Sequence, residues 1–102
     1  MPVAMLQSAE MFTKEMYDQV TDKMFGHSPM RPEESPEGLI VHSAGTAEGS
    51  WYVYDIWESK EAFQRFMDEK LDPAVREVMR DQQLPPEAAP QFFQIEVLVI
   101  PS

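Results

Sequence analysis

Hydrophobic and polar residues alternate along four short stretches of the chain. These stretches are residues 2–8, 39–44, 51–57 and 92–100. Successive side chains of a β-strand point to opposite faces, so the alternation predicts four strands. In the third stretch, Asp55 shares a face with Trp51 and Trp57, while Tyr54 lies on the opposite face. Both faces of this strand are largely apolar, so each needs a covering layer.

Two longer stretches repeat apolar residues at helical spacing. The first begins after Thr13, a predicted N-cap, and ends at Gly26, a predicted C-terminal stop. The second begins after Ser59, another predicted N-cap. Asp72 and Pro73 predict that the helix restarts there, as N-cap and first helical residue, with a kink or break. The sequence therefore predicts two amphipathic helices, the second interrupted.

Proline-rich segments separate these elements. Residues 26–38 contain Pro29, Pro32 and Pro36, so a surface loop is expected there. A loop of this length is either a solvated connector, which we favour, or a lid over a pocket. His27 lies in it, where we expect solvent exposure. Residues 45–49 form a turn between the second and third strands, and residues 81–91 form another loop.

The element order is β-α-β-β-α-β, which predicts an α+β fold of the ferredoxin-like type with an antiparallel sheet. The 102 residues suit a single domain spanning 1–102. Two helices can cover one face of the sheet only. The other apolar face predicts a homodimer in which two sheets face each other.

Charge and composition narrow the classes of partner. The net charge is −10, and nucleic-acid binding needs a cationic surface, so no nucleic acid is expected. No cysteine is present, which excludes disulfides and thiolate chemistry. Apolar runs are far shorter than the roughly 18 residues of a membrane span, and no signal-peptide pattern opens the chain. The default expectation is a cytoplasmic protein without membrane contact.

His42 and Asp55 are the candidate catalytic residues. His42 lies within a strand and could act as a base near neutral pH, or it could be a core histidine satisfied by one hydrogen bond. Asp55 interrupts an aromatic strand, where a buried carboxylate needs a partner, either His42 or one of Arg65 and Arg76. The catalytic alternative has Asp55 orienting His42, which requires both side chains on one side of the hairpin.

Aromatic residues are the candidate ligand contacts. Tyr17 or Tyr54 could donate a hydrogen bond to a substrate oxygen, and Trp57, Phe63 and Phe66 could wall an aromatic ligand. The alternative is that these aromatics are simply core. The two histidines, His27 and His42, have no metal-binding spacing, so no metal is expected.

The run WESKEAFQRF at 57–66, preceded by the strand GLIVH at 38–42, resembles the dimeric α/β-barrel superfamily, especially small antibiotic-biosynthesis-monooxygenase-like proteins. The resemblance spans nearly the whole chain and implies a homodimeric barrel with a pocket between sheet and helices in each subunit. The superfamily includes cofactor-independent oxygenases, heme-degrading enzymes, polyketide cyclases and members without known activity.

Two positions bear on which of these activities the resemblance implies. Many relatives carry a histidine, and heme degraders a tryptophan, where this chain has Phe66, and Arg76 takes the place of the heme-ligating histidine. We therefore expect no cofactor. The resemblance favours a protein that binds a flat aromatic or polyketide-like compound, as a cofactor-independent oxygenase or proton-transfer isomerase. The alternative is a non-catalytic binding or assembly module, and whether a reaction occurs stays open.

Overall fold

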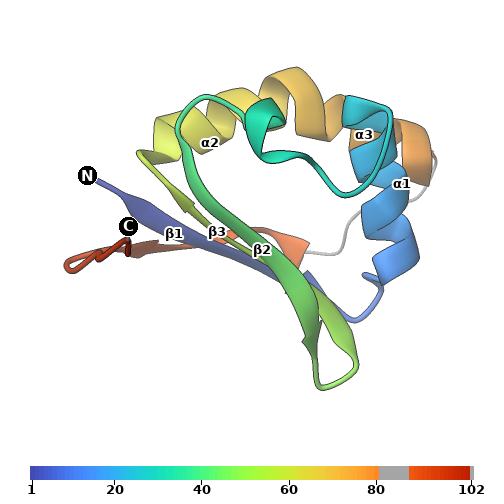
Figure 1. Cartoon of the computed structure of the whole chain (residues 1–102). Helices are drawn as coiled ribbons and strands as arrows, with labels where there is room; N and C mark the ends of the chain where they lie inside the picture. Colours follow the sequence, from blue (N-terminus) through green and yellow to red (C-terminus); the bar gives the residue numbers. More distant parts are fainter. Residues whose placement is uncertain (81–87, 102) are drawn as a thin grey trace.

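A computed structural model describes residues 1–80 and 88–101, and in these residues one antiparallel sheet carries helices on a single face (Figure 1). The strands are β1 (Val3–Ala9), β2 (Leu39–Ala47), β3 (Ser50–Trp57) and β4 (Gln91–Gln94). The helices are α1 (Lys14–Phe25), α2 (Lys60–Phe66) and α3 (Asp72–Met79), with a 3₁₀ turn at Pro32–Glu34 and a π-helical segment at Met67–Leu71. The sheet order is β2-β3-β1-β4, so the predicted ferredoxin-like topology is confirmed.

The predicted helix caps are confirmed. The Thr13 hydroxyl accepts the amide of Met16 at 3.1 Å, and the Ser59 hydroxyl accepts that of Ala62 at 3.1 Å. Gly26 ends α1 in the left-handed region with φ 84°. Each cap satisfies a backbone group that the helix cannot satisfy itself, so local sequence defines where α1 and α2 begin.

The break predicted at Asp72 and Pro73 is misplaced. Asp72 is the first residue of α3, with helical φ −60° and ψ −45°, and the irregularity is the π-helical segment Met67–Leu71 before it. Proline has no N–H, so Pro73 cannot bond the carbonyl four residues earlier. The amide of Asp72 bonds instead to the carbonyl of Met67, five residues back. The helix widens into a π turn rather than ending.

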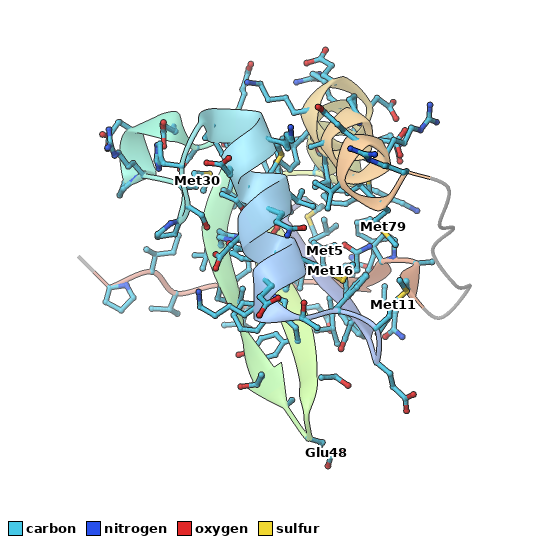
Figure 2. All side chains as sticks on the ribbon, turned by 90° about the vertical axis from the view of Figure 1, so that its right-hand side faces the viewer. Met5, Met11, Met16, Met30, Glu48 and Met79 are labelled. Atoms are coloured by element: carbon cyan, nitrogen blue, oxygen red, sulfur yellow. The ribbon has the colours of Figure 1, made fainter. Side chains whose placement is uncertain are left out.

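The β2–β3 hairpin is longer than predicted. β2 continues to Ala47, and a two-residue turn at Glu48 and Gly49, with φ 52° and 86°, replaces the expected turn at 45–49. Positive φ at both positions matches the right-handed twist of the strands. Glu48 lies at the hairpin tip (Figure 2). At this end the paired strands extend the sheet beyond the helical layer (Figure 1).

β4 is much shorter than the predicted strand at 92–100. Gln94 pairs with Val3 at the beginning of β1, and the last backbone bond runs from the amide of Ile95 to the carbonyl of Pro2, at 3.3 Å. Beyond that point β1 offers no further residue to pair with. Val97 and Val99 are consequently 82% and 77% exposed. An apolar strand sequence forms a strand only where a neighbour supplies backbone partners.

The core lies between the sheet and α2. Trp57 is 1% exposed and Phe63 2%, with their rings edge to face at 5.6 Å. Phe63 makes a second edge-to-face contact with Phe92 of β4, at 5.4 Å. Met5 of β1 and Ala62 complete this buried cluster. None of the helices in the described part of the chain is long and apolar enough to cross a membrane.

Candidate functional site

A cavity of about 90 Å³ lies between the sheet and the helices, and we call it the first chamber. Its walls come from β1, α1, the loop at 26–38, both hairpin strands, α2 and the π-helical segment. Most of the lining is apolar, and the polar exceptions are Gln7, Tyr17, Thr21, His42 and Asp55. A pocket between helices and sheet, as the family resemblance implied, is therefore present.

Three of these polar side chains form a chain of hydrogen bonds, the Tyr17–His42–Asp55 relay. Tyr17 Oη lies 2.5 Å from His42 Nε2. His42 Nδ1 lies 2.7 Å from Asp55 Oδ1. The second carboxylate oxygen, Oδ2, accepts the indole N–H of Trp57 at 3.2 Å. Every polar atom of the imidazole ring and both carboxylate oxygens thus have a partner.

Strand register brings His42 and Asp55 together. The two residues are direct partners across the β2–β3 pair, so their side chains leave the sheet on the same face. Strand alternation alone would place Ile40 on the same face as His42, but a register shift between Leu39 and Val41 puts Leu39 on the helix-facing side instead. Tyr17 reaches the pair from α1, and its ring is nearly parallel to that of His42, with centroids 5.9 Å apart and an interplanar angle of 8°.

The hydrogen-bond partners of His42 indicate which of its ring nitrogens carries a proton. A carboxylate only accepts, so His42 Nδ1 must donate to Asp55, and the neutral imidazole then accepts at Nε2 from the Tyr17 hydroxyl. Burial raises the pKa of Tyr17, a hydrogen bond with Thr21 partly offsets this, and the negative charge of Asp55 raises it further. Tyr17 therefore keeps its proton at physiological pH and can donate it to His42 Nε2.

The raised pKa of Tyr17 predicts a loss of stability at high pH. Below its ordinary value of 10.0, the tyrosine is protonated in both folded and unfolded chains and contributes no pH dependence. Above that value the unfolded chain releases the proton first, so the free energy of unfolding falls as pH rises. Urea denaturation between about pH 9 and pH 11 should show a shallower decline for Tyr17→Phe than for the wild type. Equal slopes would contradict the assignment.

The structure brings most of the predicted site residues to one place. Trp57, Phe63 and Phe66, the predicted ligand contacts, line the first chamber. Trp57 also donates to Asp55, a role that was not predicted. Tyr54 was expected to anchor a substrate and does not reach this chamber. It lies on the opposite face of β3 and is 37% exposed, because strand alternation separates it from Asp55.

Two polar residues of the chamber were not among the predicted site residues. Thr21 is 3% exposed and lies one helical turn after Tyr17, so the spacing alone could have placed it beside the tyrosine. Gln7 of β1 donates to the carbonyl of Ala88 at 2.8 Å, a contact across 81 positions that no local pattern indicates. Of the two, only Thr21 had a signal in the sequence.

The loop at 26–38 covers the first chamber. Its Met30 and Pro36 are part of the lining, which favours the lid over the solvated connector. Glu34 holds the loop folded by accepting the amide of Arg31 at 2.8 Å and by pairing with His27 Nε2 at 2.9 Å. These two contacts, with the backbone amide the larger, lower the pKa of Glu34. His27 is thus a partly buried structural partner rather than the solvent-exposed residue expected.

Removing the Glu34 carboxylate is expected to loosen this loop. In Glu34→Ala the amide of Arg31 loses its acceptor, so it should exchange with solvent roughly threefold to tenfold faster by hydrogen exchange NMR. Glu33→Ala is the matched control, since Glu33 is an exposed acid in the same 3₁₀ turn. Unchanged exchange in Glu34→Ala, or equal acceleration in the control, would show that the carboxylate does not hold the loop.

The residues of the chamber do not fit a heme. Both nitrogens of His42 already have partners, so the ring has no free atom for iron. Arg76 has a side chain that is 79% exposed and is paired with Asp72 at 3.0 Å, away from the chamber. Among residues 1–80 and 88–101, no group of three or more acidic or histidine side chains could hold a metal ion. The volume of about 90 Å³ is also below the roughly 300 Å³ of sites for drug-sized ligands.

Comparison with known proteins supports the fold. No protein-family model matches the chain, and no curated protein matches it. Among solved structures, the heme-degrading protein Rv3592 from Mycobacterium tuberculosis, heme free, aligns over 97% of this chain and 99% of its own, with 17% identity and a TM-score of 0.55. The same protein, MhuD, with two hemes bound in its active site, gives 18% identity, the same coverages and a TM-score of 0.50.

A further similar structure is the structural-genomics protein YJCS. It aligns over 94% of this chain and 100% of its own, with 14% identity and a TM-score of 0.58. At these identities the likeness concerns the fold alone. These structures therefore support the ferredoxin-like arrangement of the chain.

Proposed function

We propose that this chain binds a small aromatic or polyketide-like compound beside the Tyr17–His42–Asp55 relay and moves a proton on it. The observation that carries the proposal is the relay itself. A histidine polarised by a carboxylate 4% exposed, and facing a phenol in an apolar cavity, is an arrangement suited to general acid–base chemistry.

The relay suggests how a proton would move. A substrate with an acidic O–H or C–H lies against the Tyr17 hydroxyl in the first chamber. Its proton passes to the Tyr17 oxygen as the tyrosine gives its own proton to His42 Nε2. Asp55 stabilises the resulting imidazolium through Nδ1–H, and Trp57 keeps the carboxylate in place. Return of the proton to another atom of the substrate anion completes an isomerisation. Reaction of that anion with O₂ instead would be a cofactor-independent oxygenation.

Cavity size limits the part of the ligand that reaches the relay. An engineered apolar cavity of about 150 Å³ binds benzene. The first chamber, at about 90 Å³, therefore suits a single ring after a small expansion. A fused multi-ring compound needs more room than this chamber provides.

The test combines native mass spectrometry with isotope exchange. The untagged protein as purified is first examined for a bound species, which identifies a compound class. A matching single-ring phenol or enolisable ketone is then incubated with protein in D₂O and followed by NMR. Catalysed deuterium incorporation at a carbon-bound position supports the proposal. Binding without incorporation above the buffer rate rejects the proton-transfer step.

The second candidate function is a non-catalytic binding or assembly module. The observation that favours it is the small volume of the first chamber, well below the roughly 300 Å³ expected for a drug-sized ligand. In that case the relay is a buried polar network that orients the hairpin against α1. Wild-type protein that copurifies with no compound and catalyses no exchange would favour this candidate.

We further propose that the chain forms a homodimer through the sheet face opposite the helices. That face carries Val41, Tyr54 and Phe93, which are 40%, 37% and 47% exposed. The segment after β4 adds the still more exposed Val97 and Val99. A second copy would cover the face and supply backbone partners for this segment.

Native mass spectrometry at micromolar concentration tests the dimer. Wild-type protein should give a mass near twice the 11.8 kDa chain. Val97→Ser combined with Val99→Ser should shift the population to monomer, because apolar area is lost from the proposed interface. Glu48→Gln, at the hairpin tip, is the control and should not shift it. A wild-type monomer at this concentration would remove the dimer proposal.

A further inference from the structure

A second chamber of about 120 Å³ adjoins the first. The two share a wall that includes Gln7, Tyr17 and Leu71. The remainder of the second chamber is formed by the residues just before α1, α1 itself, the start of β3, the π-helical segment and α3. Its lining is largely apolar, with Thr13 and Asp72 as polar exceptions. Tyr17 thus borders both spaces, with its hydroxyl in the relay.

Trp51, one of the residues that line the second chamber, carries an unpaired donor that is covered by protein. Trp51 Nε1 is the one buried side-chain nitrogen or oxygen without a hydrogen-bond partner in residues 1–80 and 88–101. Leaving a buried N–H unpaired costs stability, so native proteins rarely do it without a reason. Protein atoms cover this nitrogen, so an acceptor can reach it only if side chains of the lining move aside.

Trp51 is placed to contact the far part of a ligand held at the relay. Its ring packs against that of Tyr17 with centroids 5.4 Å apart. Trp51 and Asp55 lie on the same face of β3, four residues apart, which at about 3.3 Å per residue is roughly 13 Å along the strand. This separation suits a molecule with one ring at the relay and a short extension towards Trp51.

The lining of the second chamber can adapt to such an extension. Three methionines belong to it: Met16, Met67 and Met79, of which Met16 and Met79 are labelled in Figure 2. Methionine side chains are unbranched and repack at low cost, so they suit a cavity that enlarges around its ligand. A ligand can therefore widen the path to a donor that is covered in the free protein.

From these observations we infer that the second chamber binds the distal part of the ligand, with Trp51 Nε1 donating to an acceptor oxygen there. The inference rests on the proposed ligand site at the relay. It defines the ligand class as a phenol or enol that carries a short chain with a carbonyl or ether oxygen. Trp51 is then a specificity-determining residue, separate from the proton-transfer relay.

A pair of matched probes tests this inference. 4-(4-Hydroxyphenyl)butan-2-one and 4-butylphenol have the same ring and chain length, but only the ketone carries a distal oxygen. Calorimetry on the full-length wild type and on Trp51→Phe, which keeps an aromatic ring and loses the N–H, measures both affinities. The ketone should lose about tenfold in affinity in the variant, while 4-butylphenol should change less than twofold.

The wild-type protein offers an independent readout if Trp51→Phe does not fold. The chain has two tryptophans. On adding the ketone, the indole N–H of Trp51 should shift downfield in the NMR spectrum, whereas that of Trp57, already bonded to Asp55, should not. 4-Butylphenol should shift neither resonance downfield.

Several outcomes would overturn the inference. They are equal losses for both probes in Trp51→Phe, no loss for the ketone, no downfield shift of Trp51, or no binding of either probe to the wild type. None of these depends on deuterium incorporation. A protein that binds the ketone through Trp51 but exchanges no proton would keep this subsite and reject the proposed reaction. The reverse result would keep the reaction and reject the subsite.

Discussion

Replacing His42 by glutamine is expected to lower the catalysed rate of deuterium incorporation by about 10²- to 10⁴-fold, the usual contribution of a general base. Glutamine can still donate to Asp55 through its amide, so the buried carboxylate keeps a partner. It cannot accept a proton from Tyr17 near neutral pH, and the relay would end at the tyrosine. The measurement is the initial exchange rate of the single-ring substrate in D₂O.

A matched control separates the relay from general effects on the fold. Tyr54→Phe removes a hydroxyl from the other face of the same hairpin, and it should leave the exchange rate unchanged. His42→Ala is a harsher change, because it leaves Asp55 with Trp57 as its one remaining donor among the described residues. If His42→Gln retained the wild-type exchange rate on a genuine substrate, the proton-transfer mechanism would be wrong.

Phe63→Ala is expected to lower the free energy of unfolding by about 3–5 kcal/mol, the usual cost of deleting a buried aromatic ring. Phe63 is 2% exposed and contacts both Trp57 and Phe92 edge to face. The deletion would leave a cavity between α2, β3 and β4 that these rigid rings fill poorly. Because small domains are stable by only about 5–15 kcal/mol, the variant would approach the unfolding threshold.

Urea denaturation followed by circular dichroism measures this effect. Gln64→Ala is the control, since it changes the next residue of α2 on its exposed face and should alter stability by no more than about 0.5 kcal/mol. A Phe63→Ala variant as stable as this control would mean that the core is organised around other residues.

Much of the fold could be predicted because its determinants are local. Alternation identified the strands, and the caps at Thr13, Gly26 and Ser59 identified helix ends, since each cap acts within a few residues. The length of β4 could not be predicted in this way. The apolar alternation of residues 92–100 is real, but pairing depends on where β1 begins, and that register is a property of the assembled sheet.

The site was predictable in its parts but not in its assembly. Strand alternation predicted that Asp55 and Tyr54 lie on opposite faces of β3. Tyr54 therefore cannot anchor a substrate in the chamber that Asp55 lines. Whether His42 met Asp55 depended on hairpin register, which the two-residue turn at Glu48 and Gly49 sets and which runs unbroken from Ala47 and Ser50 to His42 and Asp55. The approach of Tyr17 to His42 depends on how α1 crosses the sheet. No pattern in the sequence encodes that crossing directly.

The π-helical segment before Pro73 affects which side chains line both chambers. A π turn inserts one residue into the helical repeat, and one residue of an α-helix corresponds to a rotation of about 100°. Leu71, the last residue of that segment, lines both chambers. A regular helix through this region would turn a different side chain towards the ligand. Pro73 therefore determines how α3 is rotated about its axis relative to α2, and with it which side chains face the chambers. Pro73 itself lines neither chamber.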